Sequence, residues 1–295
     1  MSSVLDEVSA RLETLPEYVS VVDAPEAAAL LALDVGTSGV RASLFDEQGR
    51  EINGAQAHNK RIFATFGDVE ELDADDLVDL IGRTLDQLFE VAGPAIDQVK
   101  LIAASCFWHS LLGVDRAGRP TTPVLGWANT RAGQAAKELR SRFNEREIHA
   151  RTGCRLHPSY WPAKLLWLRT ERPADFQATA RWLSFADYLV LRLFGETASS
   201  VSMASGTGLM NQRTCQWDQE LVSALELSVA ELPEIAEANK TFGGLRAEFG
   251  LRWPQLRHSR APRAATPATA MAPGTSMRIS RWIGSSMRPW TGMSP

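Results

Sequence analysis

A continuous apolar run at residues 28–36 leads into a small polar turn and then into residues 40–46, which alternate apolar and polar side chains. A short apolar run that ends at a turn is typical of a buried strand, and strict alternation is typical of a half-buried one. The pattern therefore predicts two antiparallel strands joined by a tight turn. A third strand is expected near residues 50–58, so the folded part of the chain begins as a sheet.

Helical and strand patterns alternate along the rest of the chain. Acidic residues at 73–76 precede apolar residues at helical spacing, and Gly93-Pro94 closes the pattern, which predicts a helix. Hairpins followed by alternating helices and strands favour an α/β or α+β fold with a mixed sheet. Further strands are expected at residues 99–107, 111–115 and 123–127. Further helices are expected at residues 131–143 and 217–227. Residues 163–194 should form two more helices, separated by residues 182–184.

The composition is that of a globular protein. Of the 295 residues, 44% are hydrophobic and 22% are charged, and no apolar stretch approaches the roughly 20 residues that cross a bilayer. The first residues include acids where a secretory signal would have basic and then apolar residues, so we expect a cytoplasmic protein without a membrane partner. Three widely spaced cysteines, Cys106, Cys154 and Cys215, indicate reduced thiols rather than disulfides or a zinc site.

Charge divides the chain into two parts. Residues 1–248 hold 24 Lys and Arg against 35 Asp and Glu, whereas residues 249–295 hold seven Arg and neither Lys nor an acidic residue. At the acid density of the body, a tail of this length would contain about six or seven carboxylates. The tail is therefore a different kind of sequence from the body.

The first motif, residues 34–41, lies at the turn after the first strand. Its glycines permit a tight turn from which backbone N–H groups and the hydroxyls of Thr37 and Ser38 could face phosphate oxygens. Asp34 suits Mg²⁺ held through water, because magnesium keeps most of its hydration shell, and Arg41 could pair with a phosphate. Considered alone, an ordinary glycine-rich turn is an equal alternative.

The second motif, residues 105–110, follows a buried strand. Ligand crevices of open α/β sheets lie at the carboxyl ends of strands, so an exposed His109 beside Trp108 is placed to hydrogen-bond a polyhydroxylated molecule. Considered alone, a histidine beside an aromatic ring is more often packed structure, and that alternative stays open.

The third motif, residues 127–131, again follows a strand. Trp127 offers an apolar face to sugar C–H groups, while the Asn129 amide and the Arg131 guanidinium offer directional hydrogen bonds to hydroxyls or a carboxylate. Asn129 or Thr130 could equally cap the next helix, a role that is compatible with binding.

Together, in this order and spacing, the three motifs resemble those of the FGGY family of carbohydrate kinases. The family's phosphate loop is similar to Asp34-x-Gly36-Thr37-Ser38 with Arg41; its Ser-x-x-Met-His loop is similar to residues 105–109; and its Trp-x-Asp-x-Arg motif is similar to residues 127–131. The resemblance covers about residues 29–255. It continues in residues 152–153, 157–160, 163–165, 202–209 and 217–218.

The resemblance implies an actin-like, ribonuclease H-like fold. Residues 28–257 would form an α/β domain with a mixed five-stranded sheet and flanking helices, after an N-terminal extension, residues 1–27. The implied reaction transfers the γ-phosphoryl group of ATP, with Mg²⁺, to a hydroxyl of a sugar, sugar acid or polyol. A homodimer stays open.

The resemblance also implies two sets of binding residues. The nucleotide phosphates and Mg²⁺ would be bound by Asp34 (through water), Gly36, Thr37, Ser38 and Arg41. The sugar would be bound by Trp108, His109, Trp127, Asn129 and Arg131.

Two departures from the family pattern bear on the choice of sugar. Asn129 replaces the usual Asp, which removes a charge and adds two donors. Trp108 stands where Met is common and gives a larger, more rigid wall. The motifs are more similar to gluconate or xylulose kinases than to glycerol kinases.

The resemblance ends near residue 257. Family members continue with a Gly-Asp-Gly-Ala-type loop whose Asp is the general base, and this loop has no counterpart here, so no catalytic residue is identified. We therefore expect negligible kinase turnover with weak sugar binding. Sugar-dependent ADP release that is lost in Asp34→Ala would contradict this expectation.

Residues 258–295 are expected to form an irregular basic tail. A segment rich in Ala, Arg, Pro, Ser and Met, without acids, is typical of GC-rich DNA translated out of frame, and we hypothesise that origin. The alternative is a basic arm that attracts phosphates, but no nucleic-acid-binding module accompanies it, so a nucleic-acid partner is disfavoured. Sequencing the coding DNA through this segment distinguishes the two.

Two other functions stay open. A noncatalytic sugar-binding fragment or module would bind sugar without any dependence on nucleotide. A different actin-like ATPase could share the phosphate loop but should lack His109 and the motif at residues 127–131.

Overall fold

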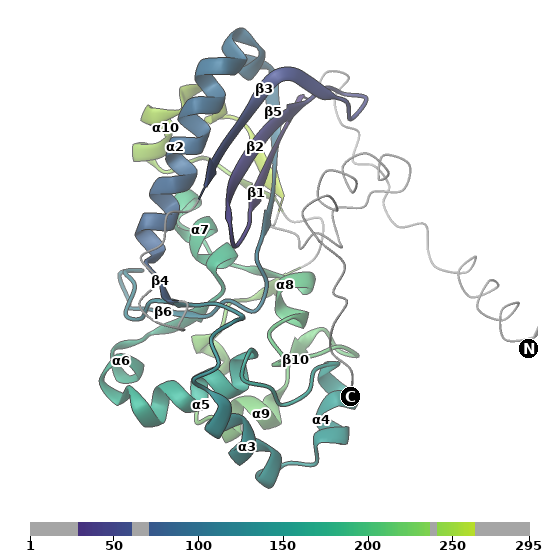
Figure 1. Ribbon diagram of the computed structural model, residues 1–295, viewed down its shortest axis with the longest axis vertical. Helices are drawn as coiled ribbons and strands as arrows, with labels where there is room; N and C mark the ends of the chain where they lie inside the picture. The colour runs from purple at the N-terminus through teal and green to yellow at the C-terminus, as the bar shows by residue number, and fades with distance from the viewer. Residues whose placement is uncertain (1–28, 61–70, 237–240, 263–295) are drawn as a thin grey trace, which may run out of the picture.

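A computed structural model describes residues 29–60, 71–236 and 241–262. The N-terminal extension, residues 1–27, and residues 263–295 of the basic tail lie outside the described residues. Figure 1 shows two regions along the long axis of the molecule: a twisted sheet with helices against it, and a region built mainly of helices. No helix in the described ranges is long and apolar enough to cross a membrane.

The sheet is mixed and has six strands. β1 pairs in parallel with β5 and antiparallel with β2, which pairs antiparallel with β3. The predicted hairpin, the third strand and the mixed sheet are thus confirmed. In sheet order the strands are β13 (Thr241–Gly243), β14 (Arg260–Pro262), β5 (Val99–Cys106), β1 (Ala29–Val35), β2 (Gly39–Phe45) and β3 (Glu51–Lys60).

The expected five-stranded sheet has six strands, and two of them, β13 and β14, are not predicted from the sequence. β14 lies within residues 258–295, for which no strand is expected, yet it pairs in parallel with β5 and antiparallel with β13. The described sheet therefore includes residues beyond 257, as far as residue 262. Three residues are too few to show a period in the sequence, and the strand is formed by its neighbours in the sheet.

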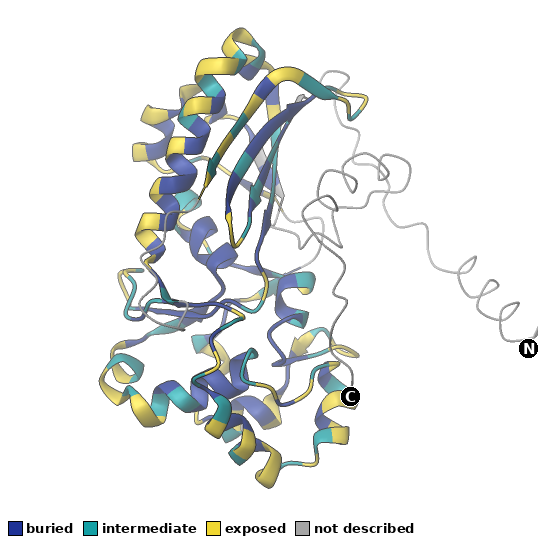
Figure 2. Ribbon diagram, in the orientation of Figure 1, coloured by how far each residue is buried: buried dark blue, intermediate teal, exposed yellow. Residues whose placement is uncertain are grey.

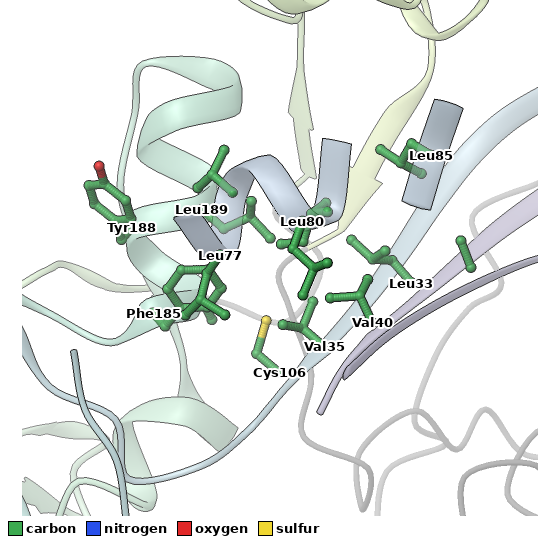
Figure 3. Packing of buried hydrophobic residues seen from close by; sticks show 14 of the residues in the cluster. Leu33, Val35, Val40, Leu77, Leu80, Leu85, Cys106, Phe185, Tyr188 and Leu189 are labelled. Atoms are coloured by element: carbon green, nitrogen blue, oxygen red, sulfur yellow. The ribbon is translucent and has the colours of Figure 1, made fainter. Parts of the chain in front are cut away.

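Helix α2 (Ala74–Ala92) covers one face of the sheet and begins and ends where the sequence predicts. The carboxylate of Asp73 accepts hydrogen bonds from the backbone N–H groups of Asp75 and Asp76, and Gly93 ends the helix. Leu77, Leu80 and Leu85 point from α2 toward the sheet, where they meet Val35 and Val40 (Figure 3). This apolar layer also includes Cys106 and residues of α7 (Phe185–Phe194).

The second region has its own apolar core, formed by α3, α5 and α9 (Figure 2). The helices are α3 (Gly133–Arg142), α4 (Glu145–Thr152), α5 (Trp161–Glu171), α6 (Pro173–Ala178), α7 (Phe185–Phe194), α8 (Val201–Ser205), α9 (Gln219–Ala224) and α10 (Ala247–Arg252), with 3-10 turns η1 (Gly93–Gln98), η2 (Val229–Glu231) and η3 (Pro254–Leu256). Two-stranded ladders join β4 (Glu71–Leu72) to β7 (Val124–Leu125), β6 (Leu112–Val114) to β8 (Arg181–Leu183), β9 (Ser199–Ser200) to β12 (Ile235–Ala236), and β10 (Met210–Asn211) to β11 (Gln216–Trp217).

The helix predicted at residues 217–227 is shorter than expected. Trp217 pairs with Met210 in β11, and the helix starts only after Asp218, whose side chain accepts a hydrogen bond from the N–H of Leu221. An N-cap residue takes an extended backbone conformation, so it separates strand from helix here.

Candidate functional site

The first motif forms the hairpin between β1 and β2. Asp34 lies in register with Arg41 on one neighbouring strand and with Ser105 on the other. Its carboxylate accepts a hydrogen bond from Ser105 Oγ at 2.8 Å and lies 3.6 Å from the Arg41 guanidinium. Strand pairing thus places one carboxylate between a hydroxyl and a cation at the carboxyl end of β1.

The turn between these strands is closed by its own backbone. The N–H of Gly36 donates to the carbonyl of Gly39 at 2.9 Å, and Thr37 and Ser38 are exposed at the tip. A Cβ at Gly39 would lie 2.5 Å from the Asn59 carbonyl oxygen, whereas one at Gly36 would lie 3.4 Å from the nearest atom. Gly39 is therefore required by the close approach of β3, a reason that the sequence does not show.

The second motif continues β5 beyond its last residue. The N–H of Phe107 donates to the carbonyl of Val35 at 3.0 Å, which sets the start of this loop beside the turn at residues 36–39. Cys106 is buried just before it, and burial raises the pKa of its thiol, so it remains protonated and unreactive. His109 then takes a left-handed backbone conformation with φ 61°.

The His109 ring is held on three sides. It stacks on Trp108 with ring centres 5.3 Å apart, and it meets Tyr160 edge-on at 4.9 Å. Its Nδ1 lies 2.5 Å from the carbonyl oxygen of Gly206. A carbonyl oxygen only accepts hydrogen bonds, so we assign the proton to Nδ1. The ring position and tautomer are therefore set by residues about 50 to 100 positions away in the chain.

His109 is mainly in its neutral form near neutral pH. Burial lowers its pKa, the hydrogen bond to Gly206 raises it, and the positive charges of Lys164 and His157 lower it. A neutral ring that donates through Nδ1 keeps a lone pair on Nε2. Because Gly206 already occupies Nδ1, Nε2 is the ring nitrogen left to accept a hydrogen bond from a ligand hydroxyl.

Trp108 and Trp127 provide two exposed aromatic faces. Their exposed fractions are 36% and 46%, and the indole N–H of Trp108 donates to the carbonyl of Ser202 at 3.2 Å. A Cβ on Gly206 would lie 2.6 to 2.9 Å from the Trp108 ring. The Trp108 ring therefore depends on glycine at position 206, the same residue that orients His109.

The first two motifs and Trp127 come together around one pocket of about 310 Å³. Its lining combines flat aromatic rings with hydroxyl, guanidinium and carboxylate groups, a combination that suits a small polyhydroxylated molecule next to phosphate. Of the predicted site residues, the pocket is lined by Asp34, Gly36, Thr37, Ser38, Arg41, Trp108, His109 and Trp127.

Asn129 and Arg131 lie outside this lining. The Arg131 guanidinium pairs with the Glu71 carboxylate and lies 4.5 Å from the centre of the Trp167 ring. Asn129 is 2% exposed, and its Oδ1 accepts a hydrogen bond from the N–H of Arg131 at 3.2 Å. Their contact with a sugar stays a prediction, and in this structure they brace the loop beneath Trp127.

Three residues that position the site have no assigned role in the sequence prediction: Gly206, Tyr160 and Lys164. Each lies in a segment that resembles the family, yet nothing in the local pattern links it to His109. Within the described ranges, no group of three or more His, Cys, Asp or Glu side chains could hold a metal ion. A cation here would depend on the single carboxylate of Asp34, on hydroxyls and on its own water.

Known carbohydrate kinases are similar to this chain in sequence. A gluconokinase from Bacillus subtilis (strain 168) is 25% identical over 227 residues, which is 76% of this chain and 43% of that enzyme. A glycerol kinase from Acidovorax ebreus (strain TPSY) is 33% identical over 224 residues, which is 74% of this chain and 45% of that enzyme. The chain thus spans less than half the length of these curated relatives.

Solved structures share the fold. The crystal structure of gluconate kinase from Lactobacillus acidophilus superposes with a TM-score of 0.74 at 25% identity, over 81% of this chain and 48% of that one. The xylulose kinase from Rhodospirillum rubrum superposes with a TM-score of 0.76 at 21% identity, over 83% of this chain and 52% of that one. At this identity the similarity shows the fold alone. These neighbours confirm the actin-like α/β fold. The profile of the FGGY family of carbohydrate kinases, N-terminal domain, matches residues 29–253, and the chain belongs to this family.

Proposed function

We propose that this chain forms the sugar-binding and phosphate-binding part of an ATP-dependent carbohydrate kinase. The observation that carries the proposal is the pocket whose lining brings together the phosphate turn, residues 36–39, with His109, Trp108 and Trp127. Phosphoryl transfer needs this juxtaposition, because the attacking hydroxyl must lie in line with the γ-phosphorus.

In the proposed reaction, a sugar hydroxyl oxygen forms a bond to the γ-phosphorus of ATP while the bond to the bridging oxygen of ADP breaks. The hydroxyl proton leaves to a base, for which the pocket of this chain offers no assigned residue. His109 would accept a hydrogen bond from another hydroxyl of the sugar through Nε2 and so orient it. Arg41 and the phosphate turn would stabilise the charge on the phosphate oxygens.

Mg²⁺ fits the donor set around Asp34. One partly buried carboxylate, 2.8 Å from Ser105 Oγ and near the turn hydroxyls, supplies hard oxygen atoms without displacing the water shell that magnesium keeps. Asp34 would hold the ion through water and thereby position the phosphates of the nucleotide. The ion itself would neutralise charge that develops on the transferred group.

The substrate class follows from the pocket walls. Two tryptophan faces suit the C–H surface of a sugar, and a neutral histidine accepts from a hydroxyl but does not neutralise a carboxylate. The pocket therefore favours a ketose or polyol over a sugar acid, among the substrates that the names of the related gluconate, xylulose and glycerol kinases suggest.

Calorimetric titration of the full chain with D-xylulose, D-ribulose, glycerol and D-gluconate tests the sugar site. We expect saturable binding of at least one of them, lost in His109→Asn and kept in His149→Asn, which changes an exposed histidine on α4. Binding that is equal in wild type and His109→Asn would remove His109 from the site. No binding of any of the four would refute the proposed function.

The phosphate site is tested with ATP in the presence and absence of Mg²⁺. We expect Mg²⁺ to tighten binding in wild type and in the exposed control Asp97→Asn, but not in Asp34→Asn. Sugar binding that does not change when nucleotide is added would instead favour a noncatalytic sugar-binding module.

A further inference from the structure

Helix α5 carries a lysine that is buried beneath the sugar pocket. The side chain of Lys164 is 1% exposed. Its ammonium group donates to the carbonyl oxygens of His109 at 2.6 Å, Gly126 at 2.9 Å and Leu125 at 3.1 Å. Three acceptors thus match the three N–H donors of the ammonium group.

These acceptors belong to two separate loops. His109 ends the loop after β5, and residues 125–126 lie just before Trp127; they are 55 and 38 to 39 residues from Lys164 in sequence. Burial of an ammonium group is costly unless its hydrogen bonds are satisfied, and an apolar side chain would leave all three carbonyls without this donor. A lysine at this point therefore holds the two loops at a set distance from each other.

Two neighbours of Lys164 strengthen the same connection. The indole N–H of Trp161 donates to the carbonyl of Ser110 at 2.8 Å, and the Ser159 hydroxyl donates to the carbonyl of Trp127 at 2.8 Å. Residues 159–164 thus bind five carbonyls, in residues 109–110 and 125–127. Both loops carry side chains that line the pocket.

We propose that Lys164 is the positioning residue of the sugar site: it joins the loop that carries His109 to the loop that carries Trp127. The inference rests on the proposed function for its consequence in binding, but the connection itself is independent of any ligand. Lys164 does not line the pocket and acts only through the backbone of the residues that do.

The first test observes the connection directly in the wild-type chain. In NMR spectra of the ¹⁵N-lysine and ¹³C-labelled protein, the Lys164 Nζ–H signal should be protected from exchange and show hydrogen-bond couplings to the carbonyl carbons of His109 and Gly126. Rapid exchange without such couplings would overturn the proposal, whatever the fate of any variant.

The second test replaces the ammonium group by an apolar side chain of similar length. In Lys164→Met the His109 ring should titrate at higher pH, because a positive charge beside it is lost, and the Trp127 indole signal should shift. Affinity for whichever of xylulose, ribulose, glycerol or gluconate the wild type binds should fall about tenfold or more. Lys137→Met, the same change on the exposed face of α3, should leave all three readouts unchanged.

Ser159→Ala removes the hydroxyl that donates to the Trp127 carbonyl and that also lies 3.2 Å from His157 Nδ1. It does not open the core, and it remains informative if Lys164→Met does not fold. It should shift the Trp127 signal and leave the His109 titration as in wild type. Since the charge of His157 and the carbonyl of Gly206 also act on His109, both are kept in every variant.

The outcomes separate the two proposals. A folded Lys164→Met with wild-type signals for His109 and Trp127, or with affinity within about twofold of wild type, would overturn the positioning role. If the wild type binds none of the four sugars, the proposed function fails, and the couplings and ring signals still decide whether Lys164 joins the loops.

Discussion

The two loops that line the pocket side by side are built in opposite ways. The phosphate turn is held by its own strands: Gly36 bonds to Gly39, and Asp34 lies in register with Arg41. The substrate loop, residues 107–110, depends on distant segments, since His109 contacts Gly206, 97 positions later, and Lys164, 55 positions later. A hairpin can form its turn locally, whereas the substrate loop takes its shape only when the two regions of the molecule pack together.

This contrast shows where each loop is vulnerable. In the phosphate turn, we expect a substitution to be most damaging at the one position where another strand lies close to it. In the substrate loop, we expect substitutions to act through buried contacts that lie outside the pocket. The following substitutions test that difference, in order of decreasing expected effect.

The largest effect is expected at the base of the phosphate turn. A Cβ at Gly39 would lie 2.5 Å from the Asn59 carbonyl oxygen, which belongs to a backbone that cannot move without disturbing β3. Gly39→Ala should lower the free energy of unfolding by about 1–3 kcal/mol. Gly36→Ala, whose Cβ would meet nothing nearer than 3.4 Å, is the matched control and should cost less than about 1 kcal/mol in urea denaturation. Equal losses of unfolding free energy in the two variants would show that the whole turn requires glycine, and not only the position that β3 approaches.

A substitution that disturbs the substrate loop should reduce sugar binding more than it reduces the stability of the fold. Gly206→Ala brings a methyl group within 2.9 Å of the Trp108 ring, which is partly exposed and can swing away. We expect a loss of about 1 kcal/mol in unfolding free energy together with loss of sugar binding by calorimetry. Gly133→Ala is the control, because nothing lies within 4 Å of its Cβ. Sugar binding that survives in Gly206→Ala would show that the close approach of Trp108 to this glycine is not needed for binding.

The pH dependence of stability should carry a contribution from His109. Burial lowers its pKa below the ordinary value of 6.5, so on acidification the unfolded chain takes up a proton that the folded chain does not. Its contribution to stability is thus complete above the unfolded pKa and is lost as the pH falls through it toward the folded pKa. His109→Asn, chosen because Asn tolerates the left-handed backbone, should reduce the loss of stability between about pH 7.5 and pH 5.5. If the unfolding free energies of wild type and variant, measured in urea, fell by the same amount over this pH range, the result would contradict a neutral, buried ring.

The smallest effect is expected at Asn129, which lies outside the pocket lining. Its Nδ2 is buried without a hydrogen-bond partner, while its Oδ1 accepts from the backbone of Arg131. Asn129→Asp replaces that donor by an acceptor beside a guanidinium group and should raise the unfolding free energy by about 0.5–1 kcal/mol at neutral pH. A carboxylate paired with arginine has a depressed pKa, so the gain should disappear as the pH falls through that pKa. A loss of stability at neutral pH would indicate that Nδ2 has a partner, such as an ordered water.

Much of the fold could be predicted from local patterns. The hairpin of β1 and β2, the limits of α2 with Asp73 and Gly93 at its ends, and the strand β5 all follow from periodicity and turn residues. Strand β14 could not be predicted, because three residues carry no period and this strand exists only through pairing with β5. The shortened α9 was missed for a related reason, since Trp217 is recruited into a ladder with Met210.

The candidate site shows the same limit. The phosphate-turn residues and the pair Trp108 and His109 were predictable, because they follow strands at the edge where ligands bind, and the structure brings them to one pocket. Asn129 and Arg131 belong to the same kind of motif, yet Arg131 turns toward Glu71 and Trp167. A motif specifies which residues follow a strand but not which way a long side chain points.

The sequence by itself determined the hairpin of β1 and β2, strand β5, helix α2, the glycine-containing turn at residues 36–39 and the family to which the chain belongs. These features depend on residue types a few positions apart, where periodicity and backbone preference act directly. Only the tertiary structure decided that Gly206 and Lys164 hold His109, that Gly39 must admit β3, and that β14 completes the sheet. Contacts between residues far apart in the chain depend on how the two cores pack, and no local pattern encodes that packing.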